Sequence, residues 1–436
     1  MNKQFIYISI ENANREILPK LLVVKEALKN NFNIVIGNRH VLFSLIDYLP
    51  KGALLEKSLH YRTEPFFKKI SKIGFSLYVL DEEALTIASI TQYMKLNYYK
   101  GNEKYLNTFF LSNLKQKEML MSSKVDKSKL YLTGTPKFEI YKKKYRNIFL
   151  EETNKIKIKY KKYILVTSRF AHINPNLSKL DDVDKLDKKY LFTSEKIFKK
   201  FIKLTIDLSK RFKSMDIIYR PHPSENINKA KSFFKNYNNV KVVYDGNVAP
   251  WILGSTLIIH NRCTTGLEGL LLKKPVISFD PINYKSIHSK FFEILGFRCN
   301  TSQKVINMAE KIIEKKKPFN KYNNKILKKY IYKFNTNQPH KKIVNFIKKN
   351  SKIEKLSLSI FTKLLLLIIG IKKSIIFNIK LFFNQKRAFY QYQKFGKINL
   401  TLLKKNMALI NAYNVRNKEA IKIKTLSWQL FLITRK

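Results

Sequence analysis

Two short stretches of the chain carry the residue types that bind phosphate. Residues 217–225 read IIYRPHPSE, and residues 258–281 read IIHNRCTTGLEGLLLKKPVISFDP. Each begins with an apolar run typical of a buried strand and turns polar where that strand should end. Open α/β sheets bind their ligands at the carboxyl ends of strands. We therefore expect both stretches to contribute to a ligand site.

The first stretch places Arg220 and His222 directly after its apolar run. Pro221 and Pro223 fix the backbone around the histidine and stop the strand from continuing. A histidine held in this way can donate a hydrogen bond to a phosphate, and Arg220 adds positive charge. Ser224 is also expected to bind the donor, which is the phosphate-bearing substrate. The alternative is a turn histidine with a structural hydrogen bond.

The second stretch places hydroxyl groups at the start of a helical pattern. Thr264, Thr265 and Gly266 would stand at a helix N-terminus, where free N–H groups and the helix dipole attract phosphate. Asn261 and Glu268 are also expected to bind the donor, with Glu268 accepting hydrogen bonds from a ribose. The alternative is an N-cap threonine on an ordinary βαβ unit, with Glu268 favouring the positive helix end.

Carboxylates follow an earlier strand-like run, FSLYV. Asp81, Glu82 and Glu83 come at its end, where one of them could act as a general base and take a proton from an acceptor hydroxyl. The alternative is a solvated helix start. Glu11 and Arg15 follow the first apolar run of the chain, and we expect them to shape the acceptor side of the site.

These residues need strands and helices to position them, and the sequence predicts both. Apolar strand-like runs alternate with amphipathic helical patterns, such as residues 16–29 and 194–212, through roughly the first 310 residues. This alternation predicts parallel sheets with helices on both faces. The expected strands are residues 5–10, 33–37, 76–80, 108–111, 130–133, 163–167, 216–219, 240–244, 256–260 and 276–279.

The strands fall into two halves joined by a basic helical stretch at residues 141–162. The expected fold class is α/β and GT-B-like, with two Rossmann-type domains facing a cleft and a basic helical C-terminal tail. Residues 1–150 would form an acceptor-side domain and residues 151–340 a nucleotide-donor domain. Residues 341–436 would form a basic amphipathic helical extension.

The C-terminal extension has its own pattern. Residues 360–371 (IFTKLLLLIIGI) are strongly apolar but too short to span a bilayer. Basic and aromatic residues follow, which is typical of amphipathic helices on a membrane surface. Anionic headgroups would attract the lysines, by roughly 1 kcal/mol each. The alternative is a helical cap that packs its apolar face onto the second domain.

Composition narrows the partners. The 436 residues carry 85 Lys+Arg against 31 Asp+Glu, a net charge of +54. Such a charge favours anionic partners, although a general drift in composition also explains many lysines. No nucleic-acid-binding module is recognisable, so we expect no specific nucleic acid partner. The two cysteines form no disulfide framework or zinc spacing, and the N-terminus has no signal-peptide pattern. A cytoplasmic protein without a metal cofactor is expected.

The order of the DEE triplet, the HP pair and the Thr-Thr pair resembles bacterial sialyltransferases that use CMP-activated acidic sugars. The longer span from IENANREILPKLLVVKEAL through DEEA and LTGTPKFEIY to CTTGLEGLLLKKPVISFDP is similar to the surface carbohydrate biosynthesis protein family. This resemblance covers residues 1–340. The chain departs from the sialyltransferase pattern at Ala84, where that pattern has glycine.

The resemblance implies an inverting, metal-independent glycosyltransferase of surface polysaccharide biosynthesis. Glu82 would be the base, with Asp81 as second choice, and His222, Thr264 and Thr265 would hold the CMP phosphate. The expected donor carries an acidic sugar such as a nonulosonate or Kdo, and the acceptor is a glycan or lipid-linked glycan. The protein would lie at the inner face of the cytoplasmic membrane, bound through its tail.

Three alternatives stay open. A CDP-glycerol-type or UDP-sugar transferase would use the same fold with another donor. A sugar-nucleotide epimerase would share the two-domain architecture. A protein of another class, a non-catalytic lipid- or nucleic-acid-binding protein, would depend on charge alone, and its binding would collapse as salt is added.

Overall fold

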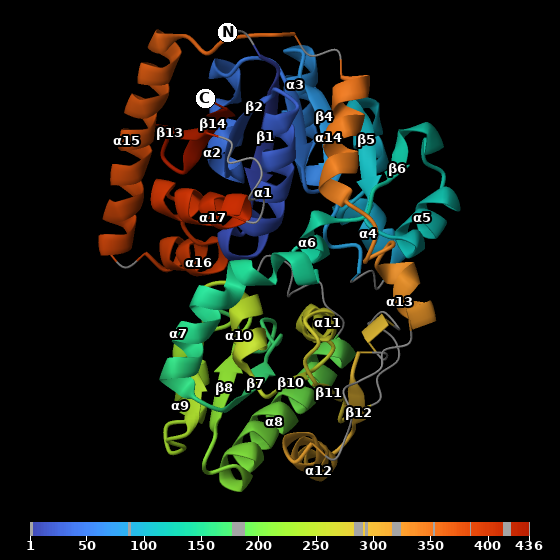
Figure 1. The fold of residues 1–436 in the computed structure, drawn as a ribbon, viewed down its shortest axis with the longest axis vertical. Helices are drawn as coiled ribbons and strands as arrows, with labels where there is room; N and C mark the ends of the chain where they lie inside the picture. The colour runs from blue at the N-terminus through green and yellow to red at the C-terminus, as the bar shows by residue number, and fades with distance from the viewer. Residues whose placement is uncertain are drawn as a thin grey trace. The chain divides into compact units, whose positions relative to one another are not determined.

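The computed structural model describes residues 3–85, 89–176, 188–282, 291–292, 295–315, 324–351, 354–383, 385–412 and 420–435. The chain forms two compact units (Figure 1). One unit comprises Met1–Tyr145, Lys325–Ala388 and Phe395–Lys436, and the other comprises Arg146–Asn324 and Phe389–Lys394. After passing through the second unit, the chain therefore returns to the first.

The first unit contains an eight-stranded sheet in the order β13-β14-β2-β1-β3-β4-β5-β6. Six strands are parallel, β14 pairs with β2 in the antiparallel direction, and β13 pairs antiparallel with β14 at the edge. The bounds are β1 (Phe5–Ile10), β2 (Asn33–Asn38), β3 (Ala53–Glu56), β4 (Ser76–Leu80), β5 (Leu106–Leu111), β6 (Leu130–Leu132), β13 (Ile421–Ser427) and β14 (Leu430–Arg435).

The chain moves outward from β1 to β2 and then returns to place β3 on the other side of β1. The loops that follow β1 and β3 therefore diverge, which is where such sheets hold ligands. Helices connect the strands: α1 (Ala13–Lys29), α2 (Arg39–Leu45), α3 (Glu64–Lys72), α4 (Ile90–Leu96), α5 (Leu114–Met121) and α6 (Pro136–Glu139).

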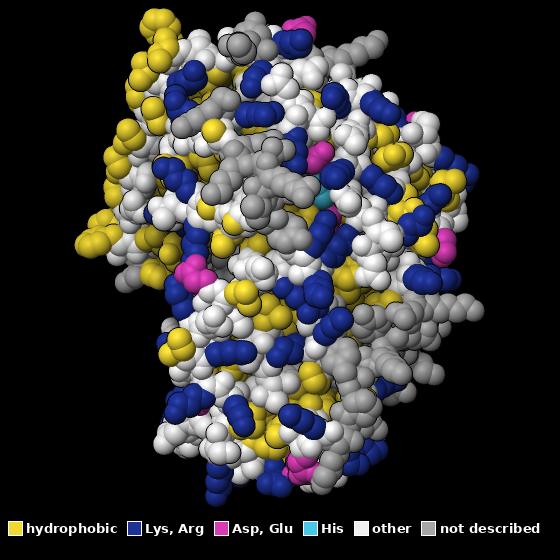
Figure 2. Space-filling view, viewed as in Figure 1, with side chains coloured by type: hydrophobic (Ala, Val, Ile, Leu, Met, Phe, Trp, Pro, Cys, Tyr) yellow, Lys and Arg dark blue, Asp and Glu magenta, His cyan; other side chains and the backbone are white. Residues whose placement is uncertain are grey.

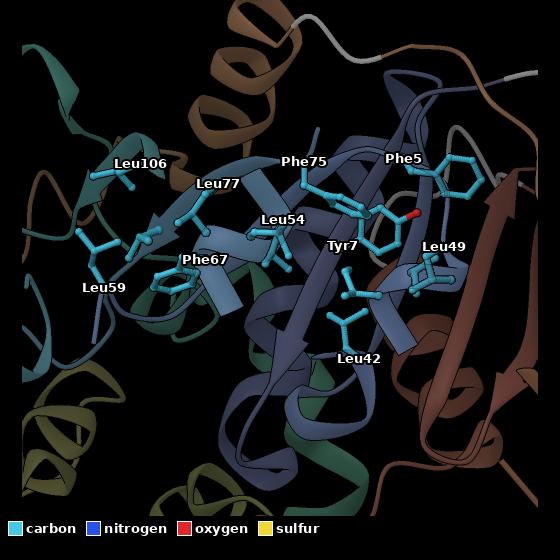
Figure 3. Close-up of a cluster of buried hydrophobic side chains, with 14 of the residues drawn as sticks. Phe5, Tyr7, Leu42, Leu49, Leu54, Leu59, Phe67, Phe75, Leu77 and Leu106 are labelled. Carbon is cyan, nitrogen blue, oxygen red and sulfur yellow. The ribbon is translucent and has the colours of Figure 1, made fainter. Parts of the chain in front are cut away.

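The core of the first unit explains why its strands are nearly continuous apolar runs. Side chains from β1, β3, β4 and α3 meet in one buried cluster (Figure 3). Tyr7 and Phe75 pack with ring centroids 5.2 Å apart, and Phe67 is fully buried elsewhere in the same cluster. Strands covered on both faces need apolar side chains on both faces.

The second unit contains a six-stranded, fully parallel sheet in the order β12-β11-β10-β7-β8-β9. Here the strand order reverses between β7 and β10. The strands are β7 (Tyr163–Thr167), β8 (Asp216–Arg220), β9 (Val240–Val242), β10 (Leu257–His260), β11 (Val276–Phe279) and β12 (Phe297–Cys299). The helices are α7 (Leu150–Tyr160), α8 (Lys188–Arg211), α9 (Ile227–Phe233), α10 (Val248–Gly254), α11 (Thr264–Leu271) and α12 (Ser302–Ile313).

The C-terminal part differs from the sequence-based division of the chain. Residues 325–340, which we assigned to the second domain, belong to the first unit, as do most of residues 341–436. The helices are α13 (Asn324–Tyr330), α14 (Pro339–Asn350), α15 (Ile360–Phe382), α16 (Lys386–Phe395) and α17 (Leu400–Ala412), and β13 and β14 follow them. Both α14 and α17 pack on α1. Their apolar faces need the first unit, so the tail is not a separate extension.

Among the described residues, no helix combines the length and the apolar character needed to cross a bilayer.

Candidate functional site

Charged side chains gather at the carboxyl edge of the first sheet. They follow β1, β3 and β4, which are neighbours in the sheet. Acidic residues are scarce in this chain, yet Glu11, Glu56 and the triplet that begins at Asp81 all lie here. The triplet comes directly after the buried strand β4, as the sequence predicted. Its three carboxylates have different surroundings.

Asp81 is fully buried and fully bonded. Its carboxylate accepts hydrogen bonds from the hydroxyl of Tyr93, from Gln116 (3.0 Å), from Asn97 (3.3 Å) and from the backbone N–H of Glu83 (2.8 Å). Burial raises its pKa to about 6, although the Tyr93 hydroxyl opposes the shift. A carboxylate held by four donors fixes the loop after β4, and its oxygens are already occupied, so it is poorly placed to take a proton from a substrate.

Glu82 is buried but incompletely bonded. The residue is 9% exposed, and its Oε1 atom has no hydrogen-bond partner among the described residues. Burial raises the pKa of this carboxyl, and the ammonium of Lys20 opposes the shift. An unpaired buried acceptor is costly unless a ligand or water donates to it. Of the triplet, Glu82 has the surroundings that suit a general base.

Glu83 lies at the surface. Its carboxylate is 3.2 Å from the guanidinium of Arg15, and both side chains are more than 40% exposed. Glu11 forms an ion pair with Lys57, which follows β3. The structure therefore brings both expected acceptor-side residues, Glu11 and Arg15, to the same sheet edge as the triplet.

Several residues at this edge were missed in the sequence. Lys20 donates to Glu16 (2.6 Å) and to the carbonyl of Ser9 (2.7 Å), and it acts electrostatically on Glu82 and Glu56. Glu56 accepts from Arg39 (2.8 Å), while its Oε2 atom has no partner in the described part of the chain. Lys137 donates to the carbonyl of Glu82. These residues come from separate elements, so no local motif marks them.

The second unit contains a buried carboxylate that organises its expected donor site. Glu225 lies 2.8 Å from the hydroxyl of Ser168 and accepts the backbone N–H groups of Phe170 (2.8 Å) and His222 (3.1 Å). It thereby joins the loop after β7 to the loop after β8. Burial raises its pKa to about 7, and the Ser168 hydroxyl opposes the shift. The motif RPHPSE contains this residue, but its role depends on the fold.

His222 is half-buried, and its ring is oriented by the loop. Its Nδ1 atom accepts a hydrogen bond from the backbone N–H of Ser224 (3.2 Å). The neutral ring therefore carries its proton on Nε2, which makes Nε2 a hydrogen-bond donor. The two prolines on either side restrict the backbone, as the sequence predicted.

Arg220 is a buried cation with donor capacity to spare. Its guanidinium donates to the carbonyl of Gly246 (2.7 Å) and stacks near the rings of Tyr244 and Trp251, at 5.2 and 5.6 Å. The Nη1 atom has no partner among the described residues. Burial lowers its pKa to about 10, so it stays charged at neutral pH. Glu268, on α11, acts electrostatically on it.

The helix α11 begins where the sequence predicted, at Thr264. Asn226 and Asn247 cap the following helices α9 and α10 with their side chains, but Cys263 makes no such hydrogen bond at α11. Thr265 is buried and Thr264 half-buried. An uncapped N-terminus leaves N–H groups for an anion.

A buried histidine stabilises the turn that precedes α11. His260 accepts the N–H of Cys263 (3.2 Å) and bonds the carbonyl of Leu295 (3.1 Å), and burial lowers its pKa to about 4. Gly266 is required above it, since a Cβ atom there would lie 2.4 Å from the ring.

Other predicted residues have structural contacts. Asn261 donates to the carbonyl of Phe279 (2.7 Å), which ties β10 to β11. Ser224 is buried, and its carbonyl accepts from Asn176 (3.0 Å). The neighbouring Arg262 is paired with Asp280. In the described part of the chain, no three His, Cys, Asp or Glu side chains are arranged to hold a metal ion.

No protein-family model matches the chain, and no curated protein is similar to it in sequence. Its membership of the surface carbohydrate biosynthesis family thus stays a prediction. Solved structures do match. An alanine variant of the wall teichoic acid polymerase TagF has a TM-score of 0.52 at 14% identity, covering 80% of this chain and 88% of that chain. A TagF variant soaked with CDPG has a TM-score of 0.51 at 15% identity, with the same coverage.

A UDP-GlcNAc 2-epimerase from Neisseria meningitidis, bound to UDP-GlcNAc, has a TM-score of 0.50 at 12% identity. The match covers 80% of this chain and 100% of that chain. At such identities the similarity shows the fold and not the activity. The expected fold class is confirmed: the protein is an α/β protein with two Rossmann-like sheets and a GT-B-like fold.

Proposed function

We propose that the protein is a metal-independent, inverting glycosyltransferase that transfers an acidic sugar from a CMP-activated donor to a glycan acceptor. The observation that carries this proposal is the buried, incompletely bonded guanidinium of Arg220. It lies at the carboxyl edge of a parallel sheet, next in sequence to the HP pair and electrostatically coupled to α11. No carboxylate among the described residues is hydrogen-bonded to this buried cation, so an anion would stabilise it, and a nucleotide phosphate supplies one.

In this proposal the second unit binds the leaving group. The N–H groups at the start of α11, the hydroxyls of Thr264 and Thr265, and the Nε2 proton of His222 would donate to the CMP phosphate. Arg220 and the helix N-terminus would offset the negative charge that develops as CMP leaves. Glu225 would act through His222, since it bonds the backbone that orients the imidazole.

The first unit would supply the base. The carboxylate of Glu82 takes the proton of an acceptor hydroxyl, and that oxygen attacks the anomeric carbon of the donor sugar. The bond between this carbon and the phosphate oxygen breaks, and the electron pair leaves with CMP. A raised pKa makes a carboxylate a stronger base. The ammonium of Lys20 opposes the rise in the pKa of Glu82 and so favours the ionised carboxylate.

The donor nucleotide has two competing identities. A CDP-glycerol-type donor is favoured by the fold shared with TagF, one structure of which was soaked with CDPG. A UDP-sugar donor, or an epimerase reaction, is favoured by the fold shared with the epimerase bound to UDP-GlcNAc. A thermal-shift panel of CMP, CDP, UDP and GDP discriminates among them, and our proposal predicts the largest shift with CMP.

Turnover is tested with the full chain and CMP-activated acidic sugars, in the presence and absence of glycan acceptors. The proposal predicts CMP release that depends on both the donor and an acceptor. An epimerase would convert a sugar nucleotide without acceptor. A non-catalytic lipid- or nucleic-acid-binding protein would release no CMP under any of these conditions.

We also propose that the protein binds the inner face of the cytoplasmic membrane through α15 and α16. Large apolar side chains on α15 are exposed at helical spacing, and Figure 2 shows them as a column along the left edge. They are Ile360, Phe361, Leu364, Leu365, Leu367, Ile368, Ile371, Ile375, Ile376, Ile379 and Phe382. Exposed apolar patches of this size mark interaction surfaces.

Only Leu366 and Gly370 of α15 are buried, on the side that faces the β13–β14 turn. Helix α17 buries Leu403, Met407 and Ile410 and packs on α1, so it covers the first unit and not the second domain that the helical-cap alternative named. Between residues 355 and 418 the sequence holds many lysines and no acidic residue. An apolar helix face flanked by lysines is what an anionic bilayer surface binds.

A further inference from the structure

The side chain of Gln393, on α16, is hydrogen-bonded at both ends. Its Nε2 atom donates to the carbonyls of Pro223 (2.9 Å) and Glu225 (2.8 Å), and its Oε1 atom accepts from Asn176 (3.0 Å). Phe389–Lys394 belong to the second unit, so these contacts lie within it. A residue from the last fifty of the chain therefore holds the loop that carries His222.

We infer that Gln393 is a positioning residue for the donor loop, defined as residues 220–226, and that it links lipid docking of α15 to donor binding. The link rests on the proposed function for the identity of the donor and for the lipid surface. From α16, the side chain of Gln393 donates to the two loop carbonyls on either side of Ser224. Its loss would leave both carbonyls without this donor.

Helix α16 also exposes the residue types that α15 exposes. Phe389 and Tyr392 are about half exposed, at 48% and 50%, and Lys386 and Arg387 are also exposed. Because α16 follows α15 in the chain, lipid would immobilise both helices together. Immobilised in this way, Gln393 would lower the conformational entropy that the loop loses when it binds phosphate. By linkage, the donor would then strengthen lipid binding by the same factor.

Hydrogen exchange of the donor loop tests the positioning role without any ligand. We compare the full-length protein with Gln393→Ala and with Gln391→Ala, a matched control because Gln391 is exposed on the same helix. The backbone amides of residues 222, 224 and 225 should exchange faster in Gln393→Ala alone. Equal exchange in all three proteins would overturn the positioning role.

The lipid link is tested by adding phosphatidylglycerol vesicles, with phosphatidylcholine vesicles as control. In the wild type, phosphatidylglycerol should slow exchange in the loop and lower the Kd for CMP. Gln393→Ala should still sediment with the vesicles, bind CMP about 5-fold more weakly and lose the lipid effect, since one hydrogen bond is worth about 1 kcal/mol. A lipid effect of equal size in both proteins, or none in the wild type, overturns the link. If CMP does not bind the wild type while the exchange results hold, the donor assignment fails and the positioning role stands.

Discussion

At the residue scale, the acidic triplet after β4 shows what a sequence motif can and cannot specify. The motif correctly placed Asp81, Glu82 and Glu83 at the end of a strand. It could not rank them, because their properties depend on residues from other elements. Tyr93 and Gln116 come from α4 and α5 and saturate Asp81, whereas Lys20 reaches Glu82 from α1. Burial and partners, not residue type, distinguish the proposed base from its neighbours.

Glu82→Gln should lower kcat by about 100- to 10,000-fold, the usual contribution of a general base. The amide keeps the shape of the side chain but cannot take a proton. Glu83→Gln is the matched control, because that carboxylate is exposed, and it should keep nearly normal turnover. The measurement is acceptor-dependent CMP release. Equal losses of kcat in the two variants would show that Glu82 is not the general base.

Glu225 should leave a signature in the pH dependence of stability. Its pKa is about 7 in the folded protein and 4.5 without the fold. Between these values the folded state binds a proton that the unfolded state has released. The stability that this group contributes is therefore complete below about pH 4.5 and falls as the pH rises toward 7.

The comparison is with Glu225→Gln, in which this position does not titrate. The Tm of the wild type minus that of the variant should decrease between pH 4.5 and pH 7. Asp81 and His260 also titrate in this range, but they do so in both proteins and cancel in the difference. A constant or rising difference would contradict the assigned shift.

At the element scale, the sequence predicted most of the strands that position the site. β1, β4, β7 and β11 have the bounds expected from their apolar runs, and the other six expected strands differ by a few residues at their ends. β3 (ALLE) and β12 (FRC) were missed because each is short and contains no β-branched residue. Short strands carry too few residues for a period to be recognised.

The hairpin of β13 and β14 was also missed, although its sequence carries a signal. IKIKT alternates apolar and basic residues, which is typical of a half-exposed strand. The hairpin was missed because residues 341–436 were expected to be helical. The alternation fits its position, because β13 is the edge strand of the sheet and its lysines discourage further pairing.

Removal of residues 420–436 should destabilise the first unit and cause aggregation. β14 pairs with β2 over four residues, and it buries Leu430 and Ile433 completely. Its loss exposes apolar surface and the edge of β2. The measurements are soluble yield and thermal unfolding of the shortened chain. An unchanged Tm would show that the hairpin is dispensable. A chain ended near Lys341 has the same defect, so lipid binding is better tested with point variants.

At the scale of the whole molecule, the charge of +54 is spread and not concentrated. Figure 2 shows Lys and Arg over much of the visible face, with few acidic side chains among them. The sequence predicted anionic partners from this charge, but it could not predict which surface they meet. The exposed apolar face of α15 became evident only when the packing of that helix was known.

The double variant Ile368→Glu, Ile371→Glu should reduce binding to phosphatidylglycerol vesicles by at least about 100-fold. Each change removes an exposed apolar side chain worth roughly 1.5–3 kcal/mol on burial and adds a repelled charge. Ile158→Glu on α7 is the matched control, because Ile158 is 80% exposed and belongs to the second unit, whereas α15 belongs to the first. Cosedimentation measures the effect. Equal binding by the three proteins would contradict the role of α15.

The central claim is that the second unit holds a nucleotide by its phosphate, and calorimetry with CMP and cytidine tests it most directly. The two ligands differ only in the phosphate, which should contact Arg220, His222 and the start of α11. CMP should bind at least about 100-fold more tightly than cytidine, since each charge-assisted hydrogen bond contributes about 1.5–3 kcal/mol. His222→Ala should remove much of this difference. Equal affinities for CMP and cytidine, or binding of neither, would contradict the claim.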